Sequence, residues 1–220
     1  MKLRCILCQL LAAAIAFLMS FSAHAETPRI TLDIDETRTL DFASGINGAS
    51  AARFIAELHR LDNGKPILIR ITSPGGDIIA GIDMIKAVQD AKSPITCAVD
   101  RYAASMAAFL AVACPNLIMH KYGILMFHEY SADIGGSRKD IKSRLDFVES
   151  IFDALVSEMS LKTGIPKAEL EAKLAKDWWL NAKEADEAHF ISATIDHYHI
   201  IKRRGIIDWF LRPITEDGLM

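Results

Sequence analysis

The sequence has no internal repeats, no low-complexity tracts and no long Gly/Ser-rich linkers, so composition gives no reason to divide the chain into several domains. Its 220 residues are 51% hydrophobic and 24% charged, which suits one globular domain with a full apolar core. We expect this domain at residues 26–196, between an N-terminal segment (1–25) and a C-terminal tail (197–220). A Walker motif is also absent, so the chain carries no ATPase of its own.

The sequence also has no excess of positive charge and few cysteines. The net charge is −3, and it falls to −5 without residues 1–25, so we expect no nucleic-acid partner bound through a basic face. Beyond residue 25 only Cys97 and Cys114 remain, both in apolar surroundings typical of small buried thiols. The sequence does not supply the distance between them. Free thiols are favoured, and a disulfide in an exported protein is the alternative. His197 and His199 have no third ligand nearby, so no metal or other cofactor is expected.

The first 25 residues are typical of a secretory signal peptide. Lys2 and Arg4 precede the apolar run CILCQLLAAAIAFLMSF, and the small residues Ala23 and Ala25 follow it. We therefore expect export to the periplasm or the medium, with cleavage after Ala25. An uncleaved membrane anchor is the alternative, although the run is a little short for a full membrane span.

Hydrophobic periodicity and turn residues predict an alternation of strands and helices in the rest of the chain. The apolar strands between residues 66 and 127 alternate with helices, which predicts a largely parallel sheet covered on both faces. A long helix with one apolar and one charged face follows at 137–164. Strands are expected at 30–34, 66–72, 94–99, 116–120, 123–127 and 190–195, and helices at 49–61, 77–91, 103–113, 137–164, 166–176 and 182–188.

Four positions raise the possibility of acyl-transfer chemistry when they are taken together. Ser105 lies near the start of a small-residue helix, where the N–H of Met106 is not used by the helix. The SPGG turn at 73–76 follows a buried strand and can point N–H groups outward. His128 ends another apolar strand and is placed to act as a base, and Asp177 can orient an imidazole. Each residue alone has a commoner structural explanation: a helix-start serine, an ordinary turn, a surface histidine or a capping aspartate.

The order of these stretches carries a family resemblance. SPGGDIIAGIDMI, AASMAAFL, ILMFH and DWWLNAKEA resemble, in order and at matching intervals, the four motifs of the Clp protease proteolytic subunit family (ClpP-like serine peptidases), over about residues 45–196. The resemblance implies an α/β crotonase/ClpP-like fold of repeated ββα units, with the long helix as a protruding handle that packs subunits into a homo-oligomer. It also implies a peptide or unfolded protein substrate. The implied roles are Ser105 as nucleophile, His128 as general base, Asp177 as orienting acid, and the N–H groups of Gly76 and Met106 as oxyanion donors.

The sequence departs from the family pattern at three places. Arg101-Tyr102 replaces a stretch with a glycine, and we expect Tyr102 to crowd the backbone beside the nucleophile. Glu129-Tyr130 replaces the usual Gln-Pro and adds a negative charge near His128. His189 replaces a turn glycine. Location is the largest departure: the cytosolic members work with an ATP-driven unfoldase, and no ATPase partner is expected outside the cytosol.

Three alternatives to an exported serine endopeptidase remain open. The first is a non-catalytic oligomeric ClpP-like scaffold or binding protein. The second is a membrane-associated peptidase with a Ser–Lys dyad, and the third is an acyl-CoA enzyme of the crotonase type. Two further stretches have no assigned role. We expect Trp178 and Trp179 in the core or at a subunit interface, and residues 202–212 on a membrane surface, on a neighbouring subunit or in a partly ordered tail.

Overall fold

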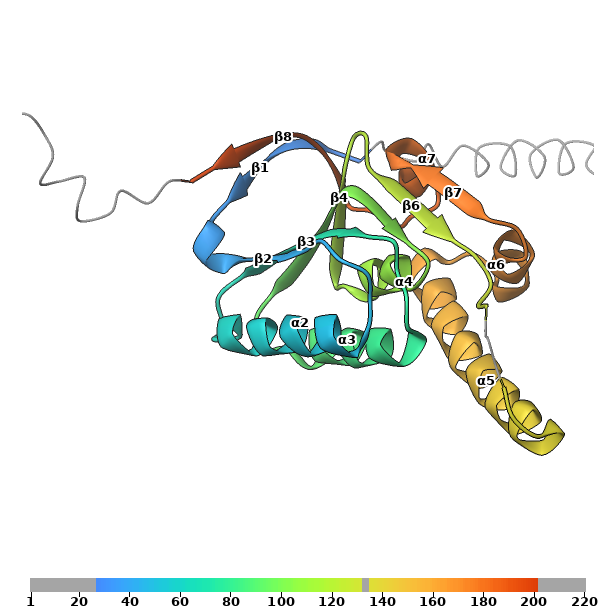
Figure 1. Cartoon of the computed structure of the whole chain (residues 1–220). Coiled ribbons are helices and arrows are strands. Elements are labelled where there is room, and N and C mark those ends of the chain that lie inside the picture. Colours follow the sequence, from blue (N-terminus) through green and yellow to red (C-terminus); the bar gives the residue numbers. More distant parts are fainter. Residues whose placement is uncertain (1–26, 132–134, 202–220) are drawn as a thin grey trace, which may run out of the picture.

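A computed structural model describes residues 27–131 and 135–201 (Figure 1). The signal peptide predicted at 1–25 and the basic, apolar stretch at 202–212 lie outside these residues. One mixed sheet runs in the order β1-β8-β5-β4-β3-β2, and β6 pairs with both β4 and β7. Every pairing is parallel except that of β6 with β7. The strands are β1 (Arg29–Ile34), β2 (Thr39–Phe42), β3 (Ile67–Ser73), β4 (Ile95–Ala104), β5 (Asn116–His120), β6 (Ile124–Phe127), β7 (Trp178–Asn181) and β8 (Ala193–Ile200).

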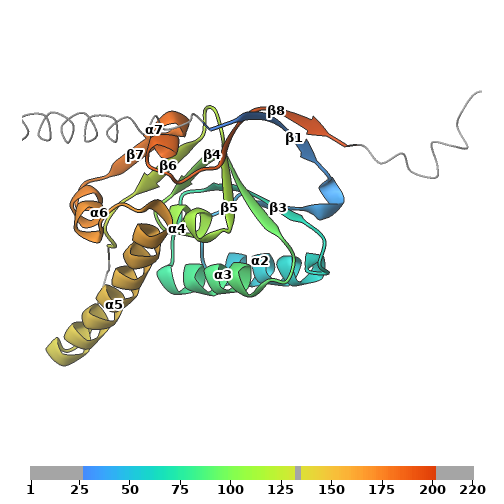
Figure 2. The ribbon, with the colours of Figure 1, turned by 180° about the vertical axis from the view of Figure 1, so that it is seen from behind.

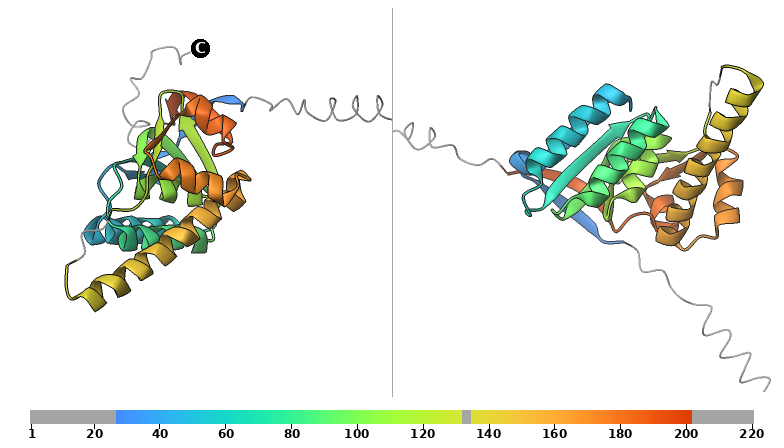
Figure 3. Two further views of the ribbon diagram at one scale, coloured as in Figure 1. Left: turned by 90° about the vertical axis from the view of Figure 1, so that its right-hand side faces the viewer. Right: turned by 90° about the horizontal axis from the view of Figure 1, so that it is seen from below.

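Capping residues mark an end of several of the helices. Asn47 caps α2 with a reciprocal bond from Ser50, Asp77 caps α3 through the N–H of Ala80, and Gly164 ends α5 in the left-handed conformation. α2 and α3 lie side by side below the sheet (Figures 1 and 3). The helical elements are η1 (Glu36–Arg38), α2 (Gly48–Leu61), α3 (Ile78–Asp90), α4 (Met106–Ala113), α5 (Arg138–Thr163), α6 (Lys167–Leu174) and α7 (Ala182–Glu187).

The prediction of a mixed α/β fold with a largely parallel sheet is confirmed, but the two faces of the sheet differ. In β3, Ile67, Ile69 and Ile71 are buried against the helices, whereas Leu68 and Arg70, which alternate with them, are only half-buried. On that second face Arg70 donates a hydrogen bond to Asp100 at 2.7 Å. The expectation of cover on both faces was therefore wrong: the second face is only partly covered, because β1 and β8 arch over it in place of a helix layer (Figures 1 and 2).

α5 packs against the rest of the described chain mainly through one of its ends. Its buried residues are Leu155, Val156, Met159 and Thr163, all near its C-terminal end, where it packs against α4 and α6. The N-terminal part of the helix projects away from the sheet (Figures 1 and 2). Phe147 on this part is 55% exposed, so an apolar ring on a helix of 26 residues lacks a covering surface within the described chain.

Several element boundaries differ from the sequence predictions. Ala103 and Ala104, expected in a helix, extend β4 because they pair with Leu125 and Met126 of β6. β2 and β7 were missed, since each has only four residues and a weak alternation signal. β8 begins at Ala193 and continues to Ile200, beyond the boundary predicted for the tail, because it pairs along its length with β1.

Candidate active site

Ser105 lies at the sharp turn between β4 and α4. Its backbone angles are φ 54° and ψ −129°, and a positive φ is rare for a residue that carries a side chain. The Ser105 N–H donates to the carbonyl of Met126 at 2.7 Å, and its own carbonyl accepts from Ala108 and Phe109 in α4. Such strain costs about 1–3 kcal/mol and persists where the surroundings determine the conformation. The turn presents the Ser105 hydroxyl at the start of a buried helix.

The SPGG turn packs directly against this serine. A Cβ on Gly75, whose φ is +86°, would lie 2.5 Å from the Ala104 carbonyl oxygen and 2.9 Å from the Cβ of Ser105. A Cβ on Gly76 would lie 2.2 Å from the carbonyl oxygen of Ile46, on the segment that bridges Gly76. The two glycines are therefore needed because the backbones approach more closely than any side chain allows.

Two backbone N–H groups near Ser105 have no acceptor in the part of the chain that the structure describes. Those of Gly76 and Met106 donate to no group within residues 27–131 and 135–201. Met106 is the first residue of α4, where helix N–H groups are free and the helix dipole is positive. Gly76 and Met106 border one cavity together with Ser105 and His128. The two residues whose amides lack an acceptor among the described residues therefore border the same cavity as Ser105.

His128 follows the last residue of β6 and meets Ser105. The distance between its Nε2 and the Ser105 Oγ is 2.8 Å. With the imidazole proton on Nδ1, Nε2 accepts the hydroxyl proton, which is the arrangement that general-base activation of a serine requires. The structure thus brings together two residues that are 23 positions apart in the sequence.

Asp177, the third residue of the predicted triad, lies directly before β7 and is exposed. Its carboxylate makes no hydrogen bond with His128 in the described part of the chain. The antiparallel register of β6 and β7 pairs Phe127 with Trp178. One further pair along the same register would place His128 opposite Asp177. The chain leaves that register at Glu129, whose N–H donates to Leu174 of α6 at 2.9 Å.

The cavity beside Ser105 has a volume of about 60 Å³, and its lining is partly polar and partly apolar. Tyr130 and Phe152 stand edge to face at one side of it, with ring centroids 5.4 Å apart. The Tyr130 hydroxyl donates to the Glu149 carboxylate of α5 at 3.3 Å. Sequence reasoning gave Tyr130 no role beyond its departure from the family pattern, and it treated Phe152 only as part of an apolar helix face. The apolar lining residues include Ile78, Met106, Phe109, Phe152 and Leu155.

The other departures from the family pattern fit into the fold. Tyr102, in the Arg101-Tyr102 pair that replaces a stretch with a glycine, is half-buried in β4 and pairs with Ile124. Glu129 is exposed. His189 has a φ of 59°, so it adopts the left-handed conformation that a glycine at this turn would provide. Trp178 packs against Phe127 with centroids 5.8 Å apart, whereas Trp179 is 56% exposed.

Cys97 and Cys114 are joined by a disulfide, with their Cα atoms 6.0 Å apart. The preference for free thiols was therefore wrong. Cys97 lies in β4 and Cys114 ends α4, and the turn at Ser105 brings these two elements side by side. A separation of 17 residues carries no information on this distance until the turn between the elements is known.

No helix in the described ranges, 27–131 and 135–201, is long and apolar enough to cross a bilayer. His199, considered above as a metal ligand, pairs through Nδ1 with Asp33 at 2.9 Å.

Comparison with known proteins identifies the family. The chain is 28% identical over 181 residues to the ATP-dependent Clp protease proteolytic subunit 1 of Protochlamydia amoebophila, covering 79% of this chain and 88% of that protein. It is 30% identical over 169 residues to subunit 2 from Prochlorococcus marinus subsp. pastoris, covering 73% of this chain and 83% of that protein. Subunit 2 of Thermobifida fusca is 30% identical over 152 residues, covering 66% of this chain and 74% of that protein. The family model described as Clp protease matches residues 22–198, and the chain therefore belongs to the Clp protease family.

Proposed function

We propose that this protein is a serine endopeptidase in which Ser105 attacks the peptide carbonyl and His128 acts as general base. The observation that carries the proposal is the 2.8 Å contact between the Ser105 Oγ and the His128 Nε2 at a strained strand-to-helix turn. His128 removes the hydroxyl proton as the C–O bond forms, then donates it to the leaving amine. Water, deprotonated by the same imidazole, finally releases the acyl group.

The N–H groups of Gly76 and Met106 are proposed to stabilise the tetrahedral oxyanion. Both residues border the cavity that Ser105 and His128 share, and neither N–H group has an acceptor among the described residues. Donors fixed in the backbone need no reorganisation during the reaction, and losing one typically costs about 100- to 1,000-fold in kcat.

Asp177 is proposed to orient His128 through Nδ1. In support, it directly precedes Trp178, the partner of Phe127, so that continuing the β6–β7 register by one pair would place it opposite His128.

The cavity favours peptides with small apolar side chains at the residue whose carbonyl is attacked. An engineered apolar cavity of about 150 Å³ accommodates a benzene molecule. The cavity beside Ser105 is less than half that size, at about 60 Å³, and Tyr130 with Phe152 limits it on one side. The peptide is proposed to bind in extended form, by strand addition beside the site.

Export and independence from an ATPase form part of the proposal. Residues 1–25 have the composition of a signal peptide. The disulfide between Cys97 and Cys114 supports an oxidising compartment, because such bonds are rare in the cytosol. The curated relatives are named as ATP-dependent subunits. Without an ATP supply, this protein would act on short or already unfolded chains.

A homo-oligomer is proposed, with α5 as the packing element. α5 projects from the body with Phe147 and Ile141 exposed, at 55% and 38% respectively, and a second copy of the chain would cover these apolar side chains.

The direct test is hydrolysis of fluorogenic peptides, without ATP, by the purified protein and by Ser105→Ala. We expect turnover by the parent and a loss of about 10⁶-fold in kcat in the variant. Ser192→Ala is the matched control. This exposed serine donates to Asn116 at the N-terminal end of β5, whereas Ser105 follows the C-terminal end of the parallel strand β4, so the variant should retain full activity. Activity that survives Ser105→Ala would disprove the mechanism.

A non-catalytic oligomeric scaffold is the second candidate. It is favoured by the exposed Asp177, whose carboxylate makes no bond to His128 in the described residues. Folded, assembled protein that neither hydrolyses peptides nor takes up a serine-reactive fluorophosphonate would select this candidate. N-terminal sequencing of the exported protein tests the cleavage site after Ala25.

A further inference from the structure

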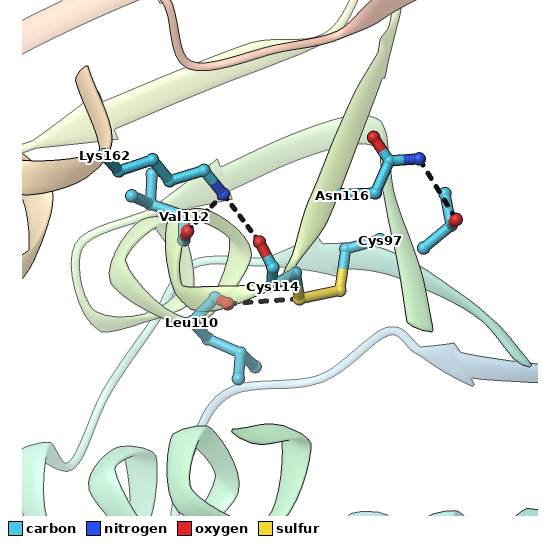
Figure 4. Close-up of a disulfide and its surroundings, with 7 residues drawn as sticks. Cys97, Leu110, Val112, Cys114, Asn116 and Lys162 are labelled. Atoms are coloured by element: carbon cyan, nitrogen blue, oxygen red, sulfur yellow. Dashed lines mark hydrogen bonds between the residues drawn. A yellow bond between two sulfur atoms is a disulfide. The ribbon is translucent and has the colours of Figure 1, made fainter. Parts of the chain in front are cut away.

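The nucleophile turn is tied at its far end by the Cys97–Cys114 disulfide. Cys97 is 0% and Cys114 1% exposed, so the bond lies inside the core. It joins β4, which leads into Ser105, to the residue that ends α4, which leads away from Ser105 (Figure 4). The covalent loop therefore encloses the nucleophile and both elements that position it.

Lys162 of α5 makes a second tie at the same end of α4. Its ammonium group donates to the carbonyl oxygens of Val112 at 2.5 Å and of Cys114 at 2.6 Å (Figure 4). The last carbonyls of a helix lack partners within the helix and carry the negative end of its dipole, so a cation stabilises them. The end of α4 is thus held by one covalent bond and one charged group from another helix.

α4 has features that make such ties necessary. It has only eight residues, MAAFLAVA, and half of them are alanine. Alanine side chains interdigitate little with their neighbours, so they resist sliding along the sheet less than long side chains do. The strained Ser105 backbone at the start of α4 would relax if the helix moved.

We propose that Cys97, Cys114 and Lys162 are positioning residues that hold α4 in place and so keep the Ser105 hydroxyl aligned with His128 and with the amides of Gly76 and Met106. The inference rests on the peptidase function proposed above. It adds that the enzyme reaches its full rate only with the disulfide formed.

Formation of the bond is an oxidation that needs a partner. The two thiols lose two protons and two electrons to a disulfide-bearing oxidant, through a mixed disulfide that the second cysteine resolves. In a reducing compartment Cys97 and Cys114 stay as thiols, and the turn at Ser105 is not held by the disulfide. The chain would therefore become fully active on entering an oxidising compartment.

The test compares oxidised protein with the same chain refolded in dithiothreitol, so that only the covalent bond differs. The other two cysteines, Cys5 and Cys8, are replaced by serine in every sample. We expect kcat to fall about 10- to 100-fold on reduction, because a misplacement of about 1 Å has an effect of this size. KM should change less than about twofold, since substrate binding is not the affected step.

Two further measurements separate positioning from general stability. Ile118→Val removes a methyl group from the separate cluster on the other face of the sheet, costs about 1 kcal/mol, and should leave kcat unchanged. Hydrogen exchange of the amides of Met106–Ala113 should be faster in the reduced chain. The Cys97→Ala/Cys114→Ala double variant should reproduce the reduced protein in kcat and in exchange.

Equal kcat in the oxidised and reduced chains would overturn the inference, and so would an equal loss in Ile118→Val. If oxidised protein neither hydrolyses peptides nor reacts with a fluorophosphonate, the proposed function itself fails. In that case hydrogen exchange in α4 still tests whether the disulfide holds the helix. Exchange rates that do not change on reduction would reject this role.

Discussion

Ser105 lies where a buried strand turns into a buried helix, whereas Asp177 lies exposed before the outermost strand of the β6–β7 pair. The serine is fixed by a glycine turn, a hydrogen bond to Met126 and the loop closed by the disulfide. The aspartate makes no side-chain hydrogen bond to any residue that the structure describes. In the proposed mechanism, the nucleophile is thus positioned by the core of the single chain, whereas the orientation of its base depends on an exposed carboxylate at the edge of the sheet.

The largest effect that sharpens this comparison is expected from Asp177→Asn. If Asp177 orients His128 in the working enzyme, kcat falls about 10⁴-fold, since the amide favours the wrong imidazole tautomer. Steady-state kinetics on a fluorogenic peptide gives the value. Asp196→Asn, on β8, is the control and should change kcat little. A loss below about tenfold would show that His128 works without this carboxylate.

Gly75→Ala tests the other region of the comparison, the turn that holds Ser105. The added Cβ would lie 2.5 Å from the Ala104 carbonyl at a φ of +86°, so the Ser105 turn must shift. We expect the free energy of unfolding to fall by at least about 2 kcal/mol and kcat to fall about 100-fold.

Gly48→Ala is the matched control for this substitution. No atom lies within 4 Å of its added Cβ, and the residue is helical, so stability should rise by up to about 1 kcal/mol. Urea unfolding measures both variants. Similar stability changes at the two glycines would refute the close packing of the Gly75 turn on Ser105.

Phe147→Glu tests whether a second copy covers α5. An unpaired carboxylate buried in an interface costs several kcal/mol, so the variant should dissociate into smaller species. Light scattering after size-exclusion chromatography reports the mass. Lys139→Glu changes an exposed charged residue of the same helix and should leave the mass unchanged. A parent protein that is monomeric throughout would remove the role proposed for α5.

The smallest effect is a pH dependence at Lys162. Burial lowers the pKa of its ammonium from 10.5 to about 8. Below pH 8 the group is charged in both states, whereas between pH 8 and 10.5 the folded state has released a proton that the unfolded state still holds. Stability therefore rises with pH across this window.

Lys162→Met removes that pH dependence. The difference in unfolding free energy between parent and variant should move in favour of the parent as the pH rises from neutral to near 10.5. Urea unfolding of both proteins at the two pH values measures it. A difference that is independent of pH would show that Lys162 keeps its ordinary pKa in the folded protein.

Much of the fold could be predicted from the sequence because its signals are local. The apolar runs of β3 and β6, the cap at Asp77 and the stop at Gly164 each act through neighbours in the chain. β7 was not predicted from the sequence, because its four residues form a strand only through pairing with β6. Ala104 reads as helical by composition but belongs to β4 because β6 provides a partner.

The features of the candidate site can also be separated into those that the sequence predicts and those that it does not. Ser105, His128 and the glycine turn were found from the order of four motifs, and the structure brings them around one cavity. The positive φ of Ser105 and the disulfide were beyond reach, since both depend on how α4 packs back against β4. The link between Tyr130 and Glu149 joins a loop to a helix and leaves no trace in the sequence pattern.

The most direct test of the central claim is the rate at which a fluorophosphonate labels the folded, oxidised protein, with the modified residue mapped by mass spectrometry. The account predicts an adduct on Ser105, formed at least about 100-fold more slowly in His128→Ala, because the imidazole then no longer removes the hydroxyl proton. An adduct on another residue, or an equal rate in the two proteins, would contradict the account.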